Sequence, residues 1–170
     1  IMAWEHTESC RDAQQRAVRF MLETTGRHFP RTPDLPSAHD PMLKGWPWVG
    51  DTHSWIEPTA MGVMALRAVG LGQHDRVKEA VRMVLDRQLP HGGWNYGNAL
   101  VLGTELRPMP EITCAALAGL AGLVERDAVR ASLAYLQHEV TRLQTPISLG
   151  WSLLGLAAWQ YAPPNAAVLI

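Results

Sequence analysis

Cysteine and net charge are both scarce in this chain, and each scarcity excludes a class of protein. The 170 residues include only two cysteines, which excludes a disulfide scaffold and a four-cysteine zinc site. The formal net charge is −1, without the excess of Lys and Arg that phosphate contacts need, so we expect no nucleic-acid partner. Hydrophobic residues make up 47% of the chain, which is enough to bury a core and argues against intrinsic disorder.

Signals for export or membrane insertion are also missing. No charged segment followed by an apolar core opens the chain, so we expect a cytoplasmic protein. The apolar runs described below are shorter than the roughly 20 residues that a bilayer crossing requires, so we predict no transmembrane segment. Peripheral membrane contact stays open, as does the interpretation that the chain is a segment of a longer reading frame.

An amphipathic pattern recurs three times and predicts helices with one exposed face. It covers residues near 12–24, 77–88 and 128–140, and the first two segments match closely in sequence. Apolar side chains there follow the i, i+3, i+4, i+7 spacing of a half-buried helix. The predicted buried stripe of the first segment is Ala13, Ala17, Phe20, Met21 and Thr24. The predicted exposed side of the second is Arg76, Lys78, Glu79, Arg82 and Asp86.

A second pattern, apolar nearly all round, alternates with the first. It covers residues 59–69, 112–124 and 147–159, and Arg67 is the one charged residue among them. A helix without a polar face is buried on all sides, so we predict three buried helices. Start and stop signals flank them: Pro58, Pro110 and Pro146 in first turns, Thr145 as an N-cap, and Gly70 and Gly72 at a helix end.

This alternation predicts an all-α fold in which inner apolar helices are wrapped by outer amphipathic ones. We expect an α/α-toroid-like array of about three helical hairpins, roughly half of a full ring. A single domain over residues 1–170 would contain repeat units near 11–70, 74–124 and 125–161. Half a ring leaves apolar helix flanks open, so we expect a protein partner or the remainder of a longer chain to cover that edge.

A motif rich in glycine and tryptophan follows the second amphipathic segment. Gln88 is followed by Gly92 and then by Trp94, in the form Q-x3-G-x-W. Glycine permits backbone conformations closed to other residues, and tryptophan offers a large apolar face with one N–H. We therefore predict that Gln88, Gly92, Gly93 and Trp94 are structural ties between helices. An aromatic version without the Gln covers residues 45–60.

Together with the Glu-Pro-Thr-Ala helix start at Glu57, this motif resembles a known repeat. Squalene-hopene cyclases, oxidosqualene cyclases and the β subunits of protein prenyltransferases share that repeat, and the wording here is closest to the squalene-hopene cyclases. The resemblance covers residues from about 12 to 160. It implies an α/α toroid and an isoprenoid or other apolar small molecule as ligand.

The catalytic groups that the resemblance would require are missing from the sequence. The cyclases protonate an alkene with a D-x-D-D motif, and no D-x-D-D occurs here. The prenyltransferases hold zinc with Asp, Cys and His, but the matching helix starts here read Glu57-x-Thr59, Glu111-x-Thr113 and Pro146-x-Ser148. Cys114 is one residue out of register, and we predict a small core residue. We expect no metal and no cofactor, and whether the chain is an enzyme stays open.

The remaining candidates lie in loops and at helix starts. Weak catalytic candidates are the carboxylates Asp51, Glu57 and Glu111, of which the last two could instead stabilise helix N-termini. Ligand-binding candidates are Trp46, Trp48, His53, Trp94 and Tyr96. In a ring, these residues and His91 would crowd one rim. We predict that His28, His39, His74 and His138 are ordinary surface residues.

Three functions are compatible with these observations. The favoured one is a squalene-cyclase/prenyltransferase-like repeat protein without a complete active site in these residues, which binds an isoprenoid, another apolar ligand or a protein partner. The second is a fragment of a squalene-hopene-type cyclase whose catalytic acid lies elsewhere. The third, by fold analogy, is a carbohydrate-active α/α-ring enzyme that uses paired carboxylates among aromatic side chains.

Overall fold

The computed structural model describes residues 8–32 and 39–163, and this part of the chain is mostly helical. Its α-helices are α1 (Arg11–Glu23), α2 (Ile56–Ala68), α3 (Asp75–Asp86), α4 (Pro110–Leu120), α5 (Arg130–Glu139) and α6 (Pro146–Ala157). Short 3-10 helices at Glu8–Cys10 and Arg126–Val129 precede α1 and α5. Strands β1 (Leu100–Val101) and β2 (Thr104–Glu105) form an antiparallel hairpin that the sequence patterns did not predict.

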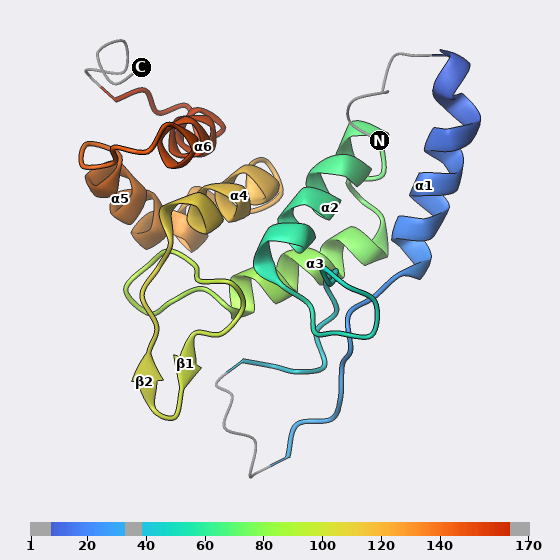
Figure 1. The fold of residues 1–170 in the computed structure, drawn as a ribbon, viewed down its shortest axis with the longest axis horizontal. Helices are drawn as coiled ribbons and strands as arrows, with labels where there is room; N and C mark the ends of the chain where they lie inside the picture. The colour runs from blue at the N-terminus through green and yellow to red at the C-terminus, as the bar shows by residue number, and fades with distance from the viewer. Residues whose placement is uncertain (1–7, 33–38, 164–170) are drawn as a thin grey trace.

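The three apolar helices pack side by side, with α4 between α2 and α6. These are the most extensive helix–helix contacts in the described chain. The amphipathic helices lie against them, α3 on α2 and α5 on both α4 and α6 (Figure 1). The loop between α1 and α2 and the β-hairpin both extend below this row of helices in Figure 1.

Helix α4 is the centre of the core. Every residue from 112 to 117 is buried, and so are Gly119 and Leu120. The main hydrophobic cluster joins α4 to residues of the other elements, such as Trp94, Leu136 and Leu156. The helix ends at Leu120, short of the predicted residue 124, because Ala121 leaves the helical conformation and Gly122 has a φ of +72°.

Small residues set the close approach of the apolar helices. A Cβ added to Gly119 of α4 would lie 3.2 Å from the Ala60 Cα of α2. A Cβ added to Gly155 of α6 would lie 2.9 Å from the Cys114 Cα of α4. Because side chains at these points would separate the helix backbones, the glycines determine how closely the row packs.

The helix boundaries follow the predicted start and stop signals with one shift. Pro110 and Pro146 stand in the first turns of α4 and α6, as predicted, and Thr145 is the N-cap residue of α6, although its side chain makes no capping hydrogen bond. Helix α2 begins at Ile56, two residues before Pro58, because the first turn needs no N–H from that position. Gly70, with a φ of +80°, follows the end of α2.

The two ends of the row depart from the predicted burial. No residue of α1 is buried, and Phe20, predicted to face the core, is 63% exposed. The side chains that pack from α1 are Val18, Met21 and Leu22, so the contact stripe is rotated from the predicted one. At the other end, Ile147 and Leu154 of α6 are 70% and 62% exposed, and the prediction that α6 is buried on all sides is wrong for the described chain.

The glycine contacts predict a contrast between two positions of α6. Gly155→Ala should lower the free energy of unfolding by about 1 to 3 kcal/mol, because the added methyl group meets the α4 backbone. Gly150→Ala is the matched control. Gly150 has no described atom within 4 Å of an added Cβ, so alanine should be neutral or stabilising by up to about 1 kcal/mol. Urea unfolding measures both values, and equal losses would contradict the close α4–α6 contact.

Candidate functional site

Trp94 connects α3 to α4. Its indole is fully buried, and its Nε1–H donates to the Val84 carbonyl of α3 at 2.7 Å. Its backbone N–H donates to the Thr113 hydroxyl of α4 at 2.9 Å, and that hydroxyl returns a bond to the Trp94 carbonyl at 3.4 Å. The indole N–H, the backbone N–H and the backbone carbonyl of the buried residue are therefore all hydrogen-bonded while its ring fills the core.

Trp46 makes the same bonds one repeat earlier. Its Nε1–H donates to the Met21 carbonyl of α1 at 2.9 Å, and its backbone N–H donates to the Thr59 hydroxyl of α2 at 2.9 Å. Met21 corresponds to Val84 in the sequence match between amphipathic segments, and Thr59 corresponds to Thr113 in the match between apolar helix starts. Equivalent positions therefore carry equivalent hydrogen bonds.

The glycine-rich turn before Trp94 docks α5. The Gln88 side-chain amide donates to the Ser132 hydroxyl at 2.6 Å, and the Gly93 N–H donates to the same oxygen at 2.7 Å. Gly92 has a φ of +97°, and a Cβ there would lie 2.5 Å from the Ala131 backbone. Gly93 also has a positive φ, of +80°. Glycine is needed at both positions because a side chain would be strained in either conformation.

Arg76 was predicted on the exposed side of α3, and that prediction is wrong. The residue is buried, and its guanidinium lies 3.9 Å above the centre of the Trp46 ring. It donates to three carbonyls of the loop between α1 and α2: Thr24, Lys44 and Gly45. Burial lowers the pKa of Arg76 from its ordinary value. The buried guanidinium is thus used to hold the loop on α3.

Two of the three candidate carboxylates come close together. Glu57 and Glu111 are both half-buried, in the first turns of α2 and α4. Burial, and then the charge of Glu111, raise the pKa of Glu57. The N-cap residues of both helices, Trp55 and Met109, make no side-chain capping bond. A negative charge is favourable at a helix N-terminus, but the raised pKa indicates that burial and repulsion outweigh this contribution at Glu57.

Asp51 lies apart from the paired carboxylates, in the exposed turn before α2. Its φ is +62°, a left-handed conformation that Asp tolerates better than most residues. Asp51 is exposed, as is its neighbour Gly50. Asp51 is therefore a turn residue in this structure.

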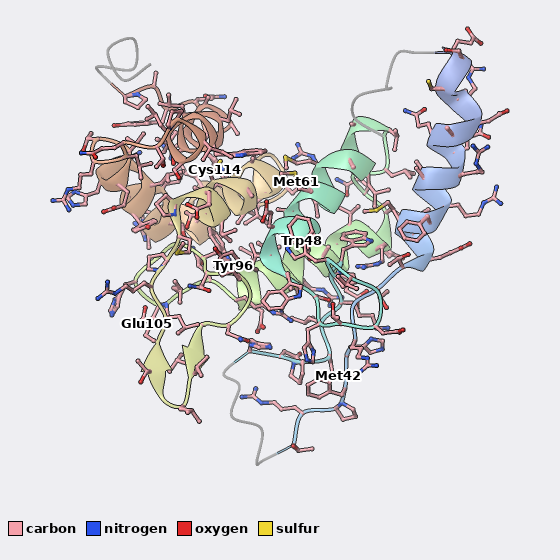
Figure 2. The ribbon with its side chains drawn as sticks, in the orientation of Figure 1. Met42, Trp48, Met61, Tyr96, Glu105 and Cys114 are labelled. Atoms are coloured by element: carbon pink, nitrogen blue, oxygen red, sulfur yellow. The ribbon has the colours of Figure 1, made fainter. Side chains whose placement is uncertain are left out.

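The candidate aromatic residues divide into two groups. Trp46 and Trp94 are buried with their N–H groups already bonded, whereas Trp48 and Tyr96 are 59% and 45% exposed. Figure 2 shows Trp48 and Tyr96 on the side of the molecule where α2 begins. The Tyr96 carbonyl accepts the Ile56 N–H, which fixes its loop against that helix start. Two exposed aromatic side chains are therefore available there to a ligand.

The candidate histidines lie in different surroundings. His91 is exposed, and its Nε2 lies 3.6 Å from the Oε2 of Glu105, a residue of strand β2. His53 packs edge-on against Phe29, with ring centres 5.9 Å apart. His53 also lines a cavity of about 220 Å³ below α2 and α3. The lining residues are Arg27, Phe29, His39, Pro41, His53, Ser54, Trp55, Arg87, Gly97 and Asn98.

Sequence reasoning missed two residues of this cavity. His39 was predicted as an ordinary surface residue, but it is half-buried, and its pKa is lowered to about 4, chiefly by burial. Arg87 immediately precedes Gln88 and is buried, and its side chain donates to the Ser54 carbonyl at 2.6 Å. The periodicity of the α3 segment contained a signal for Arg87, which follows the buried Val84 by three residues and so continues the buried stripe, whereas Arg82 lies on the other side of the helix.

A second hollow, an apolar groove, lies along the exposed side of α6. Its volume is about 690 Å³. It is lined by Gln144, Pro146, Leu149, Gly150, Leu153, Leu154 and Ala157. Gln144 is the one side chain among them with a hydrogen-bonding group, so the groove suits an apolar occupant.

Metal and membrane signatures are absent from the part of the chain that the structure describes. No three His, Cys, Asp or Glu residues gather there in a way that could hold a metal ion. Cys114, as predicted, is a buried core residue. Its thiol donates to the Trp151 carbonyl, and burial raises its pKa to about 12. Among residues 8–32 and 39–163, every helix is too short or too polar to cross a bilayer.

Comparison with known proteins adds no relative to this picture. A scan against protein-family models and searches of curated proteins and of solved structures found no match. The resemblance to the cyclase and prenyltransferase repeat therefore stays a prediction that depends on the residues quoted for it.

The Trp94 bonds predict a stability cost that depends on one N–H. Trp94→Phe keeps most of the buried ring but leaves the Val84 carbonyl without its donor, so the free energy of unfolding should fall by about 2 kcal/mol. Gln88→Ala should cost about 1 kcal/mol through loss of the bond to Ser132. Trp48→Phe, at an exposed site, is the control and should change stability by less than about 0.5 kcal/mol. Equal urea midpoints for all three variants would exclude the predicted tie.

The raised pKa of Glu57 predicts that Glu57→Gln stabilises the protein near neutral pH. In the folded state the charged form of Glu57 is disfavoured, so an ionised Glu57 opposes folding above its folded pKa. The melting temperature of Glu57→Gln should exceed that of the wild type at pH 7, by the equivalent of at most about 1 kcal/mol. The difference should vanish as the pH falls through the folded pKa and Glu57 takes up a proton. Glu125→Gln, at an exposed residue outside these first turns, is the control, and a destabilised Glu57→Gln would contradict the repulsion.

Proposed function

We propose that this chain is a helical-repeat protein that binds an apolar partner along α6 and does not carry a complete active site in these residues. The observation that carries the proposal is the exposed apolar side of α6, where Ile147 and Leu154 are 70% and 62% exposed. A contiguous apolar surface of this kind is typical of an interaction site.

The packing of the neighbouring helix supports this interpretation. Helix α4 has the same apolar character as α6, and it is covered on its two flanks by α2 and α6. Helix α6 has α4 on one flank and α5 nearby, and its other flank forms the groove of about 690 Å³. An apolar helix gains from burial on both flanks, so the sequence of α6 is suited to a further neighbour.

The small residues indicate what kind of neighbour would fit. Each step along the row places a glycine of one helix against a small residue of the preceding one, Gly119 against Ala60 and Gly155 against Cys114. Gly150 lies in the groove of α6, and an added Cβ there would have no described atom within 4 Å. A further apolar helix could approach at Gly150 as closely as the helices of the row approach each other.

The arrangement would then be part of an α/α toroid, with α2, α4 and α6 as inner helices and α1, α3 and α5 as outer ones. The partner helix would come from further repeats of a longer chain or from a second protein. An isoprenoid is the alternative occupant, because the groove walls are almost entirely hydrocarbon. Neither occupant requires a D-x-D-D motif or a zinc site.

Photo-crosslinking can identify the occupant. A benzophenone amino acid replaces Leu154 in the groove or, as the matched control, Phe20 on α1, which is 63% exposed and equally apolar. Both variants are irradiated in cells that express the protein, and the products are sequenced by mass spectrometry. We expect residue 154 to capture one defined apolar helix that residue 20 does not capture. The added substitution Ile147→Glu should reduce this capture at least about fivefold, because it places a charge at the edge of the groove, on the exposed helix face that Leu154 shares.

The other outcomes each decide against part of the proposal. A prenyl lipid captured at residue 154 would replace the helix by the isoprenoid alternative. Products at residue 154 that match those at residue 20 in identity and amount would exclude a specific partner at α6. Capture that persists unchanged in Ile147→Glu would place the contact outside the groove.

A further inference from the structure

The cavity beside the loop between α1 and α2 contains a buried cation whose hydrogen-bonding capacity is mostly unused. Arg87 lines this cavity and is only 6% exposed. Its side chain makes one hydrogen bond in the described chain, to the Ser54 carbonyl, and its Nε–H is buried without a partner. No described carboxylate lies within ion-pair distance of it. A buried guanidinium in such a position is costly unless an anion neutralises it.

Arg76, the other buried arginine in the described chain, makes more contacts than Arg87 does. The Arg76 guanidinium is also buried without a described carboxylate partner, and its Nε–H likewise has no hydrogen bond, but its other two nitrogens donate to three carbonyls and it stacks on the Trp46 ring. Its role is therefore accounted for by the fold. Arg87 has one carbonyl and a cavity wall, so its remaining N–H groups are the ones suited to a ligand.

The other polar groups around the cavity favour an anion. Among the residues that the structure describes, Arg27, His39, His53 and the Asn98 amide line it with Arg87, and no Asp or Glu does. Two described carboxylates act on these groups through their charge, Asp40 on His39 and Asp86 on Arg87, and each already accepts a backbone N–H. Asp86 accepts the Asp40 N–H at 2.8 Å, and Asp40 accepts the Met42 N–H at 2.9 Å.

The lowered pKa of His39 agrees with positively charged surroundings. Its pKa is lowered to about 4, first by burial and then by the charges of Arg87, His53 and Arg31. Asp40 acts in the opposite direction but does not restore the ordinary value. An anion in the cavity would offset this positive potential and favour protonation of His39, which would add a second charged donor.

We propose that this cavity binds a small dianion, the phosphate group of a phosphate monoester, between Arg87 and Arg27. Two guanidinium groups with two imidazoles suit a doubly charged group better than a single carboxylate. The rings of Phe29 and Trp55 form apolar walls for a small organic substituent. At about 220 Å³ the cavity is smaller than the roughly 300 to 1,000 Å³ of drug-sized ligand pockets, which restricts the ligand to a compact monoester. This site is separate from the α6 groove and does not depend on its function.

Isothermal titration calorimetry with phenyl phosphate and with inorganic phosphate tests the proposal, at constant ionic strength. We expect the wild-type protein to bind both, and phenyl phosphate more tightly. Arg27→Ala, at an exposed residue, should weaken binding about tenfold through loss of one charge-assisted contact. Arg87→Met should abolish binding, and circular dichroism checks that this variant is folded. Arg82→Ala, at an exposed arginine on α3 outside the cavity lining, is the matched control and should leave affinity unchanged.

Three results would overturn the site. The first is the absence of binding of either phosphate by the wild-type protein. The second is equal weakening by Arg27→Ala and Arg82→Ala, which would show unspecific charge attraction. The third is benzoate binding as tightly as phenyl phosphate, which would reject the dianion as the recognised group. If Arg87→Met does not fold, the Arg27→Ala and Arg82→Ala comparison decides alone.

Discussion

The structure depends on one buried hydrogen-bonded residue, Trp94, at the point where three helices meet. Its indole N–H binds the carbonyl end of α3, its backbone N–H binds the Thr113 hydroxyl of α4, and the preceding Gly93 N–H binds Ser132 of α5. All these bonds are shielded from water. In such a buried position, leaving a polar group without a partner costs more free energy than its hydrogen bond contributes. The turn therefore fixes the relative positions of α3, α4 and α5 through polar contacts, and the apolar packing of α4 follows from that placement.

The same construction at Trp46 uses different chemistry to hold the next outer helix. At the Trp94 turn, the Ser132 hydroxyl of α5 accepts bonds from the turn. At the Trp46 turn, the Arg76 guanidinium of α3 donates bonds to carbonyls of the loop. The Trp–Thr pair is thus the constant part of each unit, and the contact with the following amphipathic helix is the variable part. This difference agrees with a sequence in which short motifs match and the segments between them diverge.

Sequence periodicity predicted the helices because their burial is set by regular spacing along one element. The apolar helices α2 and α4 follow from their composition, and Pro110 and Pro146 locate helix starts to the residue. Burial imposed by another element was not predictable. Arg76 is buried because the loop between α1 and α2 covers it, and His39 is half-buried within that loop, which has no periodicity to place it. Likewise, the exposed face of α6 depends on what packs beside it, which composition alone does not state. The carboxylate pair Glu57 and Glu111 could be expected from the matched helix starts, whereas the cavity around Arg87 could not.

The α6 groove and the Arg87 cavity differ in chemistry, and the difference bears on catalysis. The α6 groove is lined by apolar residues and one amide, so it offers no group that could transfer a proton near neutral pH. The cavity at Arg87 offers cations and imidazoles but no carboxylate. The paired carboxylates Glu57 and Glu111 line neither of them. An acid–base mechanism needs its proton donor within hydrogen-bond reach of a bound substrate. In the described chain, the two hollows considered for a ligand are therefore separate from this carboxylate pair, and that separation supports the binding function proposed above.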